Sequence, residues 1–148
     1  MNSGMNDLPD DLESAVTELL LVTGQLTRRL RAVANARELT WSQMAIITRL
    51  GSQGPLTTAD LARSESVKPQ SMGVALGILE QDGLVARQPH PSDGRQVLFA
   101  LTEEGMAVRR QARLAQQEWL RGAVAKLSGD EQQTLVAAIA LFRRIGES

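Results

Sequence analysis

The residues most suited to a chemical task stand at positions 93–95, where Asp93 and Arg95 are separated by a single glycine. Asp-Gly favours a tight turn, because glycine takes the positive φ of primed hairpin turns without a Cβ clash. The pattern therefore predicts a hairpin with Arg95 at its tip and Asp93 paired with it. A guanidinium held in this way suits the minor groove of DNA, where negative potential is focused. The alternative is a surface ion pair of little energetic weight.

Strand patterns flank this turn. Positions 84–88 predict the first strand, and in positions 97–101 Val97, Phe99 and Leu101 alternate with their neighbours as in a half-buried strand. Thr102 then predicts a helix N-cap, because its hydroxyl can accept a backbone N–H of the first turn. Arg87, in the first strand, is a candidate either to contact phosphate or to brace the hairpin.

Short helices are predicted upstream of the hairpin. Thr40 with Gln43, and Thr57 with Asp60, have the spacing of helix N-caps. The first of these helices is expected to end at Gly51, Gly54 and Pro55. Pro69 predicts the start of a third helix that ends at Gly83. Two short helices followed by a hairpin indicate a winged helix-turn-helix.

The second helix of such a motif enters the major groove with its N-terminal residues facing the base edges. Here those residues are Lys68, Gln70 and Ser71. Glutamine can donate to and accept from adenine, lysine can donate to guanine or phosphate, and serine can meet either. The alternative is an ordinary exposed helix start.

The combined spacing resembles that of the multiple-antibiotic-resistance regulator (MarR) family. Its wing signature, Asp-x-Arg, five residues, Leu-Thr-x-x-Gly, is filled at every fixed position by Asp93, Arg95, Leu101, Thr102 and Gly105. Residues 56–62 and 79–85 are similar to the beginning and end of the family's helix-turn-helix. One departure is Gly73-Val74, where members often carry Thr-Arg.

The resemblance implies a homodimeric transcriptional regulator, most often a repressor, that binds a pseudo-palindrome in double-stranded DNA. It also implies an aromatic or phenolic effector bound between the dimerisation helices and the winged module. Trp41 and Trp119 are candidates to line that pocket, with Arg28 or Arg29 meeting an anionic group. Core packing and solvent exposure are the alternative roles for these four side chains.

Apolar stripes predict long helices on both sides of the module. One follows a start near Pro9 and runs toward Ala36, along Leu12, Val16, Leu19, Thr23, Leu26, Leu30 and Val33. Two more are predicted after Thr102, the last opened by Ser128 and Glu131. They suit either a monomeric bundle or a two-fold dimer. The expected fold is mainly α with a small β-hairpin wing, divided into dimerisation helix 1–36, winged module 37–103 and dimerisation helices 104–148.

Composition limits the classes of function. A chain of 148 residues supports one domain with a core. It has no cysteine, which excludes disulfides and thiolate metal sites and fits a cytoplasmic location. The acidic start lacks the pattern of a signal peptide, and no apolar run is long enough to cross a membrane. The formal net charge of −1 predicts modest, salt-sensitive DNA binding.

An enzyme is not expected, because no catalytic motif is present and the single histidine, His90, has no evident nucleophile to activate. One histidine also cannot build a metal site, so neither metal nor cofactor is expected. Two alternatives to a ligand-controlled regulator stay open. One is a helical dimer whose winged module docks a protein, and the other is a DNA-binding regulator that senses no ligand.

Overall fold

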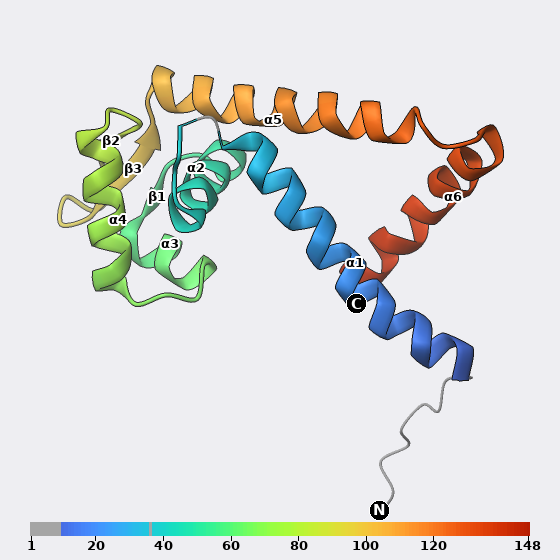
Figure 1. The fold of residues 1–148 in the computed structure, drawn as a ribbon. Helices are drawn as coiled ribbons and strands as arrows, with labels where there is room; N and C mark the ends of the chain where they lie inside the picture. Colours follow the sequence, from blue (N-terminus) through green and yellow to red (C-terminus); the bar gives the residue numbers. More distant parts are fainter. Residues whose placement is uncertain (1–9, 36) are drawn as a thin grey trace, which may run out of the picture.

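The computed structural model describes residues 10–35 and 37–148. It places a small mixed module at one end of two long helices, and a third long helix stands apart from the module (Figure 1). The elements are α1 (Asp10–Ala34), α2 (Trp41–Gln53), β1 (Leu56–Thr57), α3 (Thr58–Ser64), α4 (Pro69–Gln81), β2 (Val85–Pro89), β3 (Val97–Leu101), α5 (Glu103–Val124) and α6 (Gly129–Gly146). The mainly helical fold with a winged module is confirmed. The expected first position of α1, Pro9, and its expected end near Ala36 lie outside the described residues.

The helices begin where side chains can cap them. Thr40 and Ser128 each accept a backbone N–H and form capping boxes with Gln43 and Glu131. The hydroxyl of Thr102 accepts the N–H of Gly105 at 3.1 Å in the same way. These contacts satisfy donors that a helix leaves free at its first turn.

The expected end of α2 was correct for Gly54 and wrong for Gly51. Gly51 lies inside the helix, which continues to Gln53 and ends at Gly54 with φ +81°. The reason is a tertiary contact: a Cβ at position 51 would overlap the side chain of Arg109 from α5. The glycine gives room for that arginine and does not end the helix.

The sheet has three antiparallel strands in the order β1-β3-β2. The hairpin β2–β3 was predicted, and its register pairs Val85 with Leu101 and Arg87 with Phe99. Strand β1 was not predicted, because its two residues are too few to show an alternating pattern. The expected alternation of β3 is only partly correct, since Phe99 and Ala100 are both buried while Val97 is 41% exposed.

One apolar core holds the module together. It is built by α2, α3, α4, the sheet and the first turns of α5, from Ile46, Ile47, Leu50, Leu61, Ala62, Met72, Leu76, Leu79, Leu84, Val85, Phe99 and Val108. Each large side chain buried here contributes about 1.5–3 kcal/mol. This core therefore holds α4 and the β2–β3 hairpin against one another.

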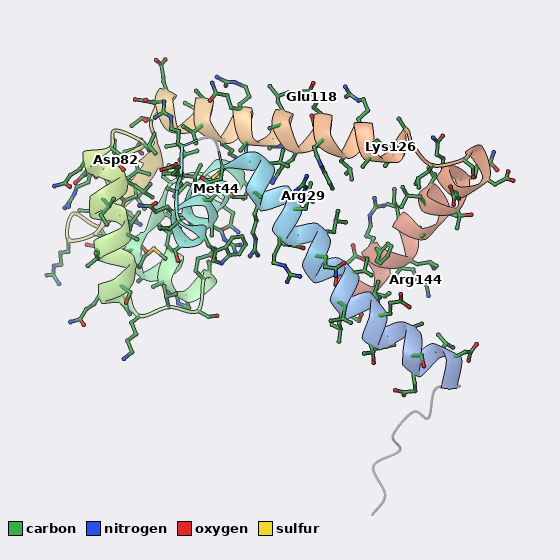
Figure 2. All side chains as sticks on the ribbon, viewed as in Figure 1. Arg29, Met44, Asp82, Glu118, Lys126 and Arg144 are labelled. Atoms are coloured by element: carbon green, nitrogen blue, oxygen red, sulfur yellow. The ribbon has the colours of Figure 1, made fainter. Side chains whose placement is uncertain are left out.

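The long helices outside the module are hardly buried. Helix α6 has no buried residue over its whole length, and Ala34 is the one buried residue among those of α1 whose burial is described. Figure 2 shows the side chains of α6, with Arg144 among them, projecting in a region that stands apart from the module. Within the described residues, no helix has the length and apolar character needed to cross a membrane.

Candidate nucleic-acid interface

The start of α4 presents three of the predicted DNA-contacting residues to solvent. Lys68 is the N-cap residue in an extended conformation, Pro69 occupies the first turn, and Gln70 and Ser71 follow on the exposed side. The opposite face of α4 is fixed in the core by Met72, Leu76 and Leu79. This division leaves the first turn of α4 free to meet a ligand as large as a duplex.

The wing loop, residues 90–96 between β2 and β3, is held by side chains of its own. Nδ1 of His90 accepts the backbone N–H groups of Ser92 at 3.2 Å and Asp93 at 3.1 Å. Oδ1 of Asp93 in turn accepts the backbone N–H of Arg95 at 3.0 Å. A chain of short contacts thus leads from the end of β2 to the backbone of Arg95, whose side chain is exposed.

Two details of the expected turn were wrong. Gly94 is not among the described residues with positive φ, so the loop is not a primed two-residue turn. Asp93 binds the backbone N–H of Arg95, and no ion pair joins the two side chains within the described residues. The physical reason is that His90 closes a longer loop and directs Asp93 toward the backbone.

Arg87 lies on β2, where it contacts two neighbouring elements. Its Nε donates to Oε1 and Oε2 of Glu80 on α4 at 3.2 and 2.9 Å. Its guanidinium also lies over the ring of Phe99, 5.4 Å from the centroid. Since α4 and β2 pack together, these contacts couple α4 to the strand that leads into the wing.

The winged module has almost balanced charge, but ion pairs leave some of its basic side chains without a carboxylate partner. Three acidic residues of this region are already neutralised, since Arg63 pairs with Asp60 at 3.1 Å, Arg49 with Glu65 at 3.1 Å and Arg87 with Glu80 at 2.9 Å. Lys68 and Arg95 form no ion pair within the described residues. No carboxylate of the described residues therefore neutralises these two charges.

The outer face of α4 also presents an apolar side chain that the sequence interpretation did not select. Val74 is 66% exposed, and Gly73 before it has open space where a Cβ would stand. An apolar group in this position can contact a thymine methyl group in the major groove. The sequence could have indicated this residue, because Val74 lies one helical turn after Gln70 and therefore on the same face of the helix.

Comparisons with known proteins agree with this geometry. Residues 39–97 match the family model described as the MarR family. A helix-turn-helix-type transcriptional regulator of Mycobacterium bovis is 38% identical over 85% of this chain and 88% of its own length. The chain belongs to the MarR family. Members of this family are DNA-binding transcriptional regulators, so the protein is a regulator of transcription and not an enzyme.

Solved structures support the assignment of the fold. A putative transcriptional regulator of Pseudomonas aeruginosa superposes with a TM-score of 0.81 at 31% identity, covering 95% of this chain and 99% of that one. A MepR variant of S. aureus bound to an oligodeoxyribonucleotide has a TM-score of 0.69 at 18% identity, covering 88% of this chain and 96% of that one. The second likeness concerns the fold of this MarR family chain alone.

A pocket of about 740 Å³ lies between α1, α2 and α5 of this MarR family regulator. Trp41 lines it, and Arg31 lies over the Trp41 ring at 3.0 Å from the centroid. Neither Arg28 nor Trp119 is among its lining residues, and Trp119 is instead approached by Arg29 at 5.9 Å. Of the four candidate effector contacts, which were Trp41, Trp119, Arg28 and Arg29, only Trp41 lines this pocket, and Arg31 is the cation beside it.

Proposed function

We propose that this regulator acts as a homodimer. The observation that supports the proposal is the unpartnered state of α6 and of the outer part of α1. Exposed apolar side chains on these helices include Leu12, Val16, Leu20, Leu26, Ile139, Phe142 and Ile145, each at least 41% exposed. Such a surface costs free energy in water, and a second copy related by a two-fold axis covers it.

The dimer reads a short pseudo-palindrome and represses, as do those relatives that are named transcriptional repressors. The two α4 helices enter successive major grooves, about 34–36 Å apart, with Lys68, Gln70 and Ser71 toward the bases. Each wing places Arg95 in the flanking minor groove. Arg87 braces the wing against α4 through its contact with Glu80. Asp93 holds the backbone of Arg95 in place by accepting its N–H.

Arg95→Ala is expected to weaken DNA binding several-fold and to leave the fold unchanged, because the side chain is exposed and carries no internal contact of its own. The measurement is the fluorescence anisotropy of labelled DNA from upstream of the protein's own gene, at two salt concentrations. Lys126→Ala is the control, since it removes the same charge just beyond the C-terminal end of α5, far from the wing (Figure 2). An Arg95→Ala variant with wild-type affinity would remove the wing from the mechanism.

His90→Phe is expected to reduce DNA affinity in the same direction as Arg95→Ala, because the two backbone donors of Ser92 and Asp93 lose their acceptor. His90→Asn retains an acceptor oxygen and is expected to recover part of the lost affinity. The same titration measures both variants. Equal affinity for wild type and His90→Phe would show that the wing loop needs no support from the imidazole.

The pocket between α1, α2 and α5 is proposed to bind an aromatic or phenolic effector that lowers DNA affinity. Its aromatic wall is Trp41, and an anionic group of the ligand would meet Arg31. The pocket joins the dimerisation helix α1 to helix α2 of the module, so a ligand there can favour one relative arrangement of the two. It shifts the DNA-bound population only by its differential affinity for the two arrangements.

Trp41→Leu is expected to weaken the response to 4-hydroxybenzoate. The concentration of this acid that releases half of the bound DNA should rise by about tenfold or more. Trp119→Leu is the matched control, because Trp119 lies outside the pocket. No release of DNA by any member of a panel of aromatic acids and phenols would favour a regulator that senses no ligand.

A further inference from the structure

The outer face of α4 carries no basic side chain beyond the N-cap. From Pro69 to Gln81 the helix contains neither lysine nor arginine. Its one acidic residue, Glu80, is paired with Arg87 at 2.9 Å. Arginine and lysine are the side chains that most often read guanine in the major groove. This part of α4 therefore lacks the usual means of selecting a G·C pair.

Val74 stands at the middle of this uncharged face. It follows Gln70 by one helical turn, and the face opposite to it is buried through Met72, Leu76 and Leu79. Val74 itself is 66% exposed, so the module covers only a minor part of its side chain. The isopropyl group is thus presented outward, beside the amide of Gln70.

Two glycines flank Val74 on the outward side of the helix. A Cβ added at Gly73 or at Gly77 would meet nothing within 4 Å, and neither glycine is among the described residues with positive φ. The fold therefore does not require glycine at either position, although glycine is less favourable than alanine inside a helix. Without side chains here, the backbone of α4 can approach the edges of base pairs closely, and a side chain as short as valine can then reach them.

The chemistry of the major groove decides which base suits such a side chain. Thymine presents its C5 methyl group, which an apolar side chain can contact, and its partner adenine presents the donor and acceptor that glutamine matches. Cytosine presents an amino group instead. Valine offers this donor no acceptor, so the amino group would lose its hydration without compensation. The face of Gln70 and Val74 therefore favours A·T pairs.

We propose that Val74 is a specificity-determining residue, and that it selects one thymine in each half-site by contact with the C5 methyl group. The proposal rests on the proposed function, in which α4 lies in the major groove. It names the base pair that the middle of α4 reads there. The operator should accordingly carry a thymine where Val74 of each copy meets the groove.

Replacement of thymine by deoxyuridine tests the proposal, because deoxyuridine keeps every hydrogen-bonding group and lacks only the methyl group. The operator is first selected from random duplexes with the full-length protein. Each of its thymines is then replaced in turn, and affinity is measured by fluorescence anisotropy at fixed salt. We expect one thymine in each half-site to respond, with a loss of about fourfold for one methyl group and about tenfold or more for both.

The variant Val74→Ala shows whether Val74 is the residue that contacts the methyl group. Alanine is compatible with the exposed helical position, so the fold should be kept. The variant should bind the thymine operator about tenfold more weakly than wild type, and it should no longer distinguish thymine from deoxyuridine at the responding position. Val136→Ala is the matched control, because Val136 is 69% exposed on α6, outside the module. It should keep the wild-type ratio of the two affinities.

Two results would overturn the proposal and leave the proposed function standing. In both, Lys68→Ala and Gln70→Ala weaken DNA binding, as expected for a helix in the groove. The first result is that no deoxyuridine substitution changes affinity. The second is that the response to deoxyuridine is the same in Val74→Ala as in wild type. If Lys68→Ala, Gln70→Ala and Val74→Ala all bind the operator as wild type does, α4 is not the reading helix, and the proposed function fails together with the proposal.

Discussion

Gly105→Ala is expected to destabilise the protein by about 2–3 kcal/mol, because the added methyl group has no space. A Cβ at this position would overlap the carbonyl oxygen of Leu84, and the side chain of Leu101 lies 3.2 Å from it. The same carbonyl accepts the N–H of Thr102 at 3.1 Å. Moving Leu84 away would therefore weaken the junction at which β2, β3 and α5 meet.

The measurement is urea denaturation at fixed protein concentration, since association contributes to the stability of an oligomer. Gly73→Ala is the matched control. It also stands inside a helix of the module, but it has open space around the new Cβ, so it is expected to stabilise by about 0.5–1 kcal/mol. Equal midpoints for Gly105→Ala and wild type would mean that the junction adapts to the methyl group.

This junction explains part of the family signature in physical terms. Thr102 caps α5 by accepting from Gly105, and its hydroxyl donates to the carbonyl of Gly83 at 2.6 Å. Position 105 requires a glycine, because the backbone of Leu84 passes so close that a Cβ would overlap it. The Leu-Thr-x-x-Gly half of the signature thus has a structural role, because it fixes how β3 of the wing joins α5. Asp93 and Arg95, in contrast, belong to the wing loop.

Local contacts could be predicted from the sequence, and contacts between distant segments could not. The caps at Thr40 and Ser128 depend on residues three positions apart, so their spacing is visible in the sequence. The pair of Arg87 with Glu80 and the stacking of Arg31 on Trp41 join different elements. Nothing in the spacing of these residues signals that the fold brings them together.

The candidate site shows the same division. The first turn of α4 and the exposed Arg95 were expected from their positions in the motif, because a helix start and a loop are defined locally. The geometry of the wing loop was not expected. It depends on the imidazole of His90, which accepts the backbone N–H of Asp93, and on the Asp93 carboxylate, which accepts the backbone N–H of Arg95. In the pocket between α1, α2 and α5, Arg31 and not Arg28 lies beside Trp41, since the placement of α1 beside α2 decides which face of α1 lines the cavity.

The double variant Ile139→Asp with Phe142→Asp is expected to convert the proposed dimer to monomers and to lower operator affinity about a hundredfold or more. Both side chains lie on the apolar face of α6, at 50% and 45% exposure in the single chain. Two carboxylates placed in an apolar interface must lose hydration without gaining partners. Once separated, each module binds its half-site alone and loses the gain in affinity from two linked contacts.

Sedimentation velocity measures the mass of the protein, and anisotropy with a full palindrome and with a single half-site measures its binding to DNA. Ala140→Asp is the control, because it adds a carboxylate to the same helix on a face away from Phe142. If avidity is the cause, the double variant should lose affinity for the full palindrome but bind the half-site as well as wild type does. A double variant that keeps the mass of wild type and its preference for the palindrome would exclude α6 from the dimer interface. The exposed apolar face of this helix would then need another partner.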